Sequence, residues 1–128
     1  MSCDTFNFKK VMQIKGSLSH QHCIPCEGGT EPLNRQEEEN YLSAVSGWEI
    51  LRESKPHQLL KNIQLKNFTQ VIELINHIAK IAEAEGHHPN LYLHDYKHLR
   101  IELYTHAIGG LSTNDFILAA KIDELLVD

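Results

Sequence analysis

The sequence predicts an α+β domain in which helices pack on one face of a four-stranded antiparallel sheet. Two pairs of segments alternate apolar and polar residues with a period of two, and a short polar turn joins the members of each pair. Three further segments carry apolar residues at three- and four-residue spacing, one before, one between and one after these pairs. The predicted order is therefore α-β-β-α-β-β-α, and the two hairpins imply an antiparallel sheet.

The first helix is predicted to begin at Asn34 and to run to about Val45. Asn34 followed three residues later by Glu37 matches a capping box, in which each residue bonds to the other's backbone N–H. Gly47 then ends the helical pattern. We expect the acidic residues 37–39 to face water near the positive end of the helix dipole.

The first hairpin is predicted from two strands, at residues 48–52 and about 57–65. The segment 53–56 between them is polar and ends in proline, which is typical of a turn. Along the second strand, Leu59 falls on one face and Leu60 on the other, because successive side chains of a strand point in opposite directions.

The longest helix is predicted between Asn67, which can cap its start, and Gly86, which can adopt the left-handed conformation that ends helices. Its apolar stripe covers about five turns, so we expect it to lie against a broad surface, the sheet. The residues of the stripe are Phe68, Val71, Ile72, Ile75, Ile78, Ala79 and Ala82.

The second hairpin follows Pro89, where the period changes to two. Its strands are predicted at residues 91–94 and 98–104, joined by a polar turn at 95–97. The second strand alternates Leu99, Ile101 and Leu103 with an outward set made of His98, Arg100, Glu102 and Tyr104.

A last helix closes the domain. Gly109 and Gly110 predict a tight turn, and Ser112 followed three residues later by Asp115 forms a second capping box. The helix then continues to about Leu126 on a mostly apolar sequence. Capping alone is a sufficient reason for Asp115 to occupy its position.

Composition and charge restrict the classes of function. The formal charge of −5 argues against a nucleic-acid surface, which needs clustered Lys and Arg. No apolar run approaches the roughly 20 residues needed to cross a bilayer, and the first twenty residues lack the apolar core of a secretory signal. The three cysteines are an odd number, which favours a reducing compartment. We therefore expect a cytoplasmic protein that binds neither nucleic acid nor a membrane directly.

The pattern divides the chain into two parts. Residues 1–22 show no sustained period, and we expect them to form a flexible N-terminal extension. Residues 23–128 are expected to form one domain, which begins with an irregular lead-in rich in Cys, Gly and Pro.

The histidines are the candidate functional residues. The chain has nine, and five of them lie between His87 and His106. Histidine titrates near neutral pH, and a fixed imidazole is suited to general acid–base chemistry. Glu83, one helical turn before His87, could hold an imidazole by a hydrogen bond. The alternative is structural, because a His-His pair after a helix can serve as a cap and alternate polar residues on a strand can simply face water.

Metal binding is the rival chemistry. His20, His22, Cys23 and Cys26 offer four zinc ligands, but their spacing is cramped and no second cysteine pair follows. We therefore expect no metal site. A Ser or Cys nucleophile is not favoured either, since the chain lacks a Gly-x-Ser-x-Gly elbow and its cysteines lie in the irregular N-terminal part.

Several separate segments share the pattern of one known family. They are Glu83, His87, His88, Pro89, Tyr96, His106 and Asp115 at their observed spacings, the run Thr-His-Ala-Ile-Gly-Gly-Leu-Ser at 105–112 with residues 115–123, the Cys-Ile-Pro-Cys-Glu-Gly-Gly run at 23–29, and Gly47-Trp48. Over about residues 23–126, the chain resembles the pterin-4a-carbinolamine dehydratases. The resemblance implies an enzyme that dehydrates 4a-hydroxytetrahydropterin to quinonoid dihydropterin without a metal or organic cofactor.

The resemblance also assigns roles to residues. The active-site histidines would be His87, His88 and His106, with His87 or His106 as the acid and base in an order that spacing leaves open. The orienting carboxylates would be Glu83 and Asp115. The residues that bind the pterin would be His88, Pro89 and Thr105, whereas His94 and His98 would be bystanders.

Two further expectations follow from the resemblance. Members of the family form homodimers or homotetramers, and some assist a protein partner without catalysis. The alternative to an enzyme is therefore a non-catalytic dimerisation or assembly cofactor that binds a protein partner. The presence of all three histidines favours the enzyme.

Overall fold

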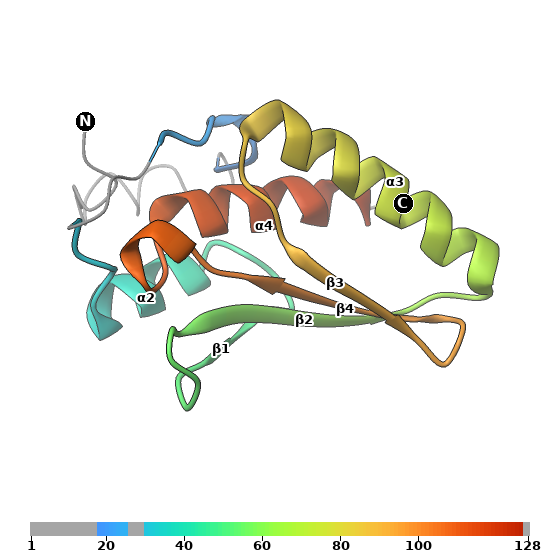
Figure 1. Ribbon diagram of the computed structural model, residues 1–128, viewed down its shortest axis with the longest axis horizontal. Helices are drawn as coiled ribbons and strands as arrows, with labels where there is room; N and C mark the ends of the chain where they lie inside the picture. Colours follow the sequence, from blue (N-terminus) through green and yellow to red (C-terminus); the bar gives the residue numbers. More distant parts are fainter. Residues whose placement is uncertain (1–17, 26–29, 127–128) are drawn as a thin grey trace.

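The computed structural model describes residues 18–25 and 30–126, and Figure 1 shows how their elements are arranged. In chain order the elements are η1 (Leu18–His20), α2 (Arg35–Leu42), β1 (Glu49–Leu51), β2 (Gln58–Gln64), α3 (Phe68–Glu85), β3 (Asn90–His94), β4 (His98–Leu103), η2 (His106–Ile108) and α4 (Thr113–Leu125).

The four strands form one antiparallel sheet in the order β1-β2-β4-β3. Helices α3 and α4 lie side by side over one face of this sheet, while α2 packs near one end of α4 (Figure 1). The predicted α+β fold and its element order are therefore confirmed.

The core lies between the sheet and the two long helices. Leu99, Ile101 and Leu103 of β4 are fully buried, as their period-two spacing predicts. Ile78 of α3 and Phe116 of α4 are fully buried against the same cluster. This packing fixes the two ends of β4 relative to α4, and the candidate site forms at one of those ends.

The outer face of the sheet is less exposed than its polar pattern predicts. Glu102, which belongs to the predicted outward set of β4, is only 8% exposed. It lies opposite the buried Leu60 in the β2–β4 register, and its carboxylate accepts a hydrogen bond from Arg100 Nε at 2.7 Å. The charge of Glu102 is thus compensated by a neighbour on its own strand.

Helix α2 differs from its prediction in two ways. Its capping box at Asn34 and Glu37 is present, but the helix ends at Leu42 rather than near Val45. Glu38, expected to face water, is 1% exposed. The reason is long-range, because Arg52 from the segment after β1 reaches the Glu38 carboxylate.

The N-terminal extension is not separate from the domain over its described part. Leu18 is 1% exposed and belongs to the core. Ser19 Oγ donates to Glu124 at 2.9 Å, and Lys121 Nζ donates to the Ser19 carbonyl at 2.7 Å. Apolar burial and hydrogen bonds therefore hold this segment on α4. Residues 1–17 lie outside the described residues.

Within the described ranges, none of the helices has the length and apolar character that crossing a membrane requires. The expected cytoplasmic location stays a prediction.

Candidate active site

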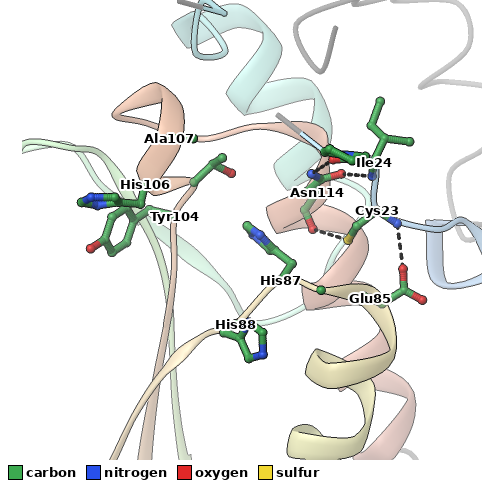
Figure 2. Close-up of a pocket in the computed structure, with 12 residues that line it drawn as sticks. Cys23, Ile24, Glu85, His87, His88, Tyr104, His106, Ala107 and Asn114 are labelled. Atoms are coloured by element: carbon green, nitrogen blue, oxygen red, sulfur yellow. Dashed lines mark hydrogen bonds between the residues drawn. The ribbon is translucent and has the colours of Figure 1, made fainter. Parts of the chain in front are cut away.

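A cavity of about 550 Å³ opens at the end of the sheet where β3 begins and β4 ends (Figure 2). Its lining comes from four parts of the chain that lie far apart in sequence. The lining residues are Cys23, Ile24, Pro25, Glu85, Gly86, His87, His88, Tyr104, Thr105, His106, Ala107 and Asn114.

Asp115 and His87 form the central pair of this site. Asp115 is fully buried, and its Oδ1 lies 2.6 Å from His87 Nε2. Its Oδ2 accepts hydrogen bonds from Thr105 Oγ1 at 2.9 Å and from the Ser112 backbone N–H at 2.9 Å. The His87 side chain is 13% exposed, so one side of its ring is available to the cavity. The pair resembles other sites in which a buried carboxylate orients a working imidazole.

Local sequence features place these two side chains. Gly86 has a φ of 64°, and this left-handed residue ends α3 and turns the chain so that His87 reaches α4. Asp115 occupies the third position of α4, where its carboxylate accepts from Ser112 and benefits from the helix dipole. The expected capping role of Asp115 and its contact with the histidine therefore coexist.

His88 points away from His87, as Figure 2 shows. Its Nε2 lies 2.5 Å from Glu83 Oε2, and both side chains are exposed, at 60% and 76%. The imidazole that Glu83 holds is thus the one at position 88. His87 and His88 diverge because consecutive residues in an extended segment point in opposite directions.

His106 does not end a strand, contrary to the sequence-based expectation. Strand β4 ends at Leu103, and His106 begins the 3-10 turn η2, where it is exposed at the mouth of the cavity. Its ring meets the edge of the Tyr104 ring at a centroid distance of 6.2 Å. A side chain on Gly110 would meet Pro32 at 2.6 Å, so this turn requires glycine there.

The segment 22–25, which we call the N-terminal strap, forms one side of the cavity. Burial raises the pKa of the Cys23 thiol to about 12, with the nearby charges of Glu85 and Asp115 acting in the same direction. Cys23 is therefore a poor thiolate and does not suit a redox or nucleophilic role. Cys26, the other half of the motif, lies outside the described residues.

The structure brings together most of the predicted site residues. The cavity is lined by His87, His88, Thr105 and His106, and Asp115 lies directly behind the imidazole of His87. Glu83 and Pro89 are not among its lining residues.

His94 and His98 pair with each other next to the β3–β4 turn, at the opposite end of the hairpin, and their rings stack at 5.3 Å. Tyr96 lies in that same turn. Neither this histidine pair nor Tyr96 lines the cavity.

Among the cavity residues that the sequence did not predict as site residues are Glu85, Asn114 and two members of the Cys-Ile-Pro-Cys run, Ile24 and Pro25. Asn114 directly precedes Asp115, which the sequence singled out, and Glu85 directly precedes Gly86, which ends α3. Neither position in the sequence indicates that the side chain contacts the N-terminal strap. The Cys-Ile-Pro-Cys run was the one feature of the sequence that pointed to this side of the cavity.

In the part of the chain that the structure describes, which excludes Cys26, no three His, Cys, Asp or Glu side chains cluster as metal ligands. Within that part, His22 interacts with Glu85, and Cys23 donates to the Asn114 carbonyl at 3.6 Å.

The chain is similar to known proteins over most of its length. A model of the family described as pterin 4 alpha carbinolamine dehydratase matches residues 31–125. The chain is 41% identical over 112 residues to "Pterin-4-alpha-carbinolamine dehydratase 2, mitochondrial" of Arabidopsis thaliana, which covers 87% of this chain and 60% of that protein. It is 46% identical over 114 residues to a "Putative pterin-4-alpha-carbinolamine dehydratase" of Rickettsia bellii, covering 89% and 98% of the two chains.

A solved structure, titled as a transcriptional coactivator/pterin dehydratase from Brucella melitensis, has the same fold. Its TM-score is 0.68 at 23% identity, and the match covers 74% of this chain and 98% of that one.

Proposed function

The chain belongs to the pterin-4a-carbinolamine dehydratase family, and from this premise we propose that it converts 4a-hydroxytetrahydropterin to quinonoid dihydropterin and water. The observation that carries the proposal is the contact between the fully buried Asp115 and His87, which lines the cavity.

The reaction needs one acid and one base. The C4a–O bond breaks and a C4a=N5 double bond forms as the N5 lone pair moves inward. An acid protonates the departing hydroxyl, which leaves as water, and a base takes the proton from N5. The balance requires no oxidant or reductant, and positioned imidazoles can act in both roles near neutral pH.

We assign His87 to one of these roles because its orientation is fixed. An ionised carboxylate only accepts hydrogen bonds, so contact with Asp115 places a proton on His87 Nε2 and leaves Nδ1 as the second functional nitrogen. The negative charge of Asp115 stabilises the imidazolium that forms when His87 takes up a proton. His87 can therefore accept and return a proton without changing its position.

The second acid–base group in the proposal is His106. It lines the cavity from the opposite side and is more exposed than His87, so it can exchange protons with solvent (Figure 2). His88 would contact the pterin at the rim, with Glu83 orienting its ring and Pro89 fixing the backbone that follows. Thr105 would act through Asp115, to which its hydroxyl donates.

The test is a dehydratase assay that follows the decay of 4a-hydroxytetrahydropterin, with the uncatalysed rate subtracted. We expect wild type to accelerate the decay and His106→Ala to lose about 10²–10⁴-fold in kcat, the usual contribution of a positioned acid–base group. If the His87→Ala, His106→Ala double variant is as active as wild type, the proposal is wrong. A folded chain that is indifferent to both changes would fit the alternative of a non-catalytic cofactor for a protein partner.

We also propose a homodimer or homotetramer. Among the described residues, β4 is the one strand paired with β3, so the other edge of β3 presents backbone groups that can pair with a second copy. Size-exclusion chromatography with light scattering measures the oligomeric state. A monomer at micromolar concentration would contradict the proposal.

A further inference from the structure

The N-terminal strap is tied to the site by two side chains that flank the central pair. Asn114 directly precedes Asp115, and Glu85 lies two residues before His87. Cys23, Ile24 and Pro25 of the strap all line the cavity. The strap is therefore held by the same two chain segments that carry the central pair, His87 and Asp115.

Asn114 binds the strap at two points. Its Oδ1 accepts a hydrogen bond from the Ile24 backbone N–H at 3.0 Å, and its Nδ2 donates to the Ile24 carbonyl at 2.5 Å. The Asn114 side chain is buried, at 4% exposure. An amide that pairs with both backbone polar groups of one residue fixes the orientation of that residue, because the two bonds together constrain its peptide planes.

Glu85 forms the second anchor. Its Oε1 accepts from the Cys23 backbone N–H at 2.7 Å, and its Oε2 lies 2.9 Å from His22 Nδ1. Burial alone would raise the pKa of the Glu85 carboxyl, but the Cys23 N–H, His22 and Lys121 outweigh it and hold that pKa below its usual range. Glu85 is thus ionised at neutral pH and is a strong acceptor for the strap.

We propose that residues 23–25 form a wall of the pterin pocket, with Asn114 and Glu85 as positioning residues that hold this wall at a fixed distance from His87. The inference rests on the proposed function. A pterin is flat, with polar edges and two faces that aliphatic side chains cover well. Ile24 and Pro25 are the aliphatic residues of the strap that line the cavity, and the backbone N–H and carbonyl of Ile24 are bonded to Asn114. In Figure 2 the imidazole of His87 lies between the strap on one side and the Tyr104–His106 pair on the other.

The wall would act on substrate affinity and not on proton transfer. Its residues carry no group suited to acid–base work, since burial disfavours the Cys23 thiolate. Loss of the wall should therefore raise KM and leave kcat nearly unchanged, which separates it from the histidines.

The experiment measures two quantities on the full-length chain. One is the Kd of 7,8-dihydrobiopterin, a pterin without the 4a-hydroxyl, by calorimetry, and the other is kcat and KM for dehydration. The variants are Ile24→Ala, which trims the wall, and Glu85→Ala and Glu85→Gln, which remove and retain the acceptor for Cys23. Ser19→Ala is the matched control, because it breaks a bond of the same N-terminal segment away from the cavity.

We expect Ile24→Ala and Glu85→Ala to raise Kd and KM by about tenfold, the equivalent of ~1.4 kcal/mol, with kcat within about twofold of wild type. Glu85→Gln should recover most of the affinity, and Ser19→Ala should match wild type. Ile24 lies in an irregular segment, so we expect Ile24→Ala to fold even if Glu85→Ala folds poorly. In that case Ile24→Ala alone tests the wall.

Unchanged Kd and KM in Ile24→Ala would overturn the inference while leaving the dehydratase intact. A wild-type chain that binds the pterin through Ile24 but does not dehydrate would instead contradict the proposed function alone. If wild type binds no pterin, both are wrong.

Discussion

Two buried carboxylates in this domain each hold a histidine, and their surroundings differ in charge. Glu38 on α2 is 1% exposed and accepts hydrogen bonds from Arg52 Nε at 3.2 Å and from His57 Nδ1 at 2.9 Å. Asp115 on α4 is fully buried and has neutral donors in addition to its histidine, His87, at 2.6 Å.

The two pairs differ in the source of the positive charge that compensates the buried carboxylate. Arg52 is always protonated, so the charge of Glu38 is compensated whatever the state of His57. Among the described residues, His87 is the one basic group within salt-bridge distance of Asp115. The proposed function therefore assigns proton transfer to the Asp115 pair, and we expect the Glu38 pair to contribute to stability alone.

The largest contrast is expected from removing each carboxylate charge. Asp115→Asn keeps the shape of the side chain but no longer stabilises an imidazolium at His87, and we expect kcat to fall by about a hundredfold or more. Glu38→Gln should leave kcat within about twofold and lower the free energy of unfolding by about 1–3 kcal/mol, because Arg52 loses a buried ionic partner. Steady-state kinetics and urea denaturation measure the two effects.

A loss of activity in Glu38→Gln as large as in Asp115→Asn, at equal stability, would show that the two pairs do not differ in function. Both variants should be assayed at a temperature where each is folded by circular dichroism.

The next effect concerns the hydrogen bonds behind each carboxylate. Thr105→Val removes the hydroxyl that donates to Asp115 at 2.9 Å, with little change in shape. We expect kcat to fall by about tenfold, since one hydrogen bond to a charged group contributes roughly 1.5–3 kcal/mol. The matched change at the other pair, Arg52→Met, should lower the melting temperature without a comparable loss of kcat. An unchanged kcat in Thr105→Val would show that catalysis does not depend on the hydrogen bond by which Thr105 orients Asp115.

The smallest effect is expected at the exposed pair of His88 and Glu83. Both side chains are mostly in solvent, and exposed ion pairs contribute about 0.2–1 kcal/mol. Glu83→Gln should therefore change kcat/KM by less than about fivefold and leave the melting temperature unchanged. A loss of a hundredfold would assign Glu83 a role as strong as that of Asp115.

Local interactions explain why the fold was predictable from the sequence. The capping box at Asn34 and the left-handed stop at Gly86 depend on residues a few positions apart, so their patterns are complete in the sequence. Glu38 was misassigned for the opposite reason. Its partners Arg52 and His57 follow 14 and 19 residues later in other segments, and an acidic run on a helix does not reveal which member is buried.

The site was predictable only in part. The resemblance supplied the roles of His87 and Asp115, whose contact spans 28 residues, whereas spacing alone left a capping role open for both. The strap shows the limit more clearly, because Cys23 meets Glu85 across 62 residues and Ile24 meets Asn114 across 90. An irregular segment has no periodicity from which to infer its neighbours.

The most direct test of the contrast between the two buried pairs is the dehydratase assay on His87→Ala and His57→Ala, measured side by side with wild type. Each variant removes a histidine from a buried carboxylate, so the two perturbations are matched in kind. We expect His87→Ala to lose about 10²–10⁴-fold in kcat and His57→Ala to stay within about threefold of wild type. Equal activity in the two folded variants would contradict the assignment of proton transfer to His87.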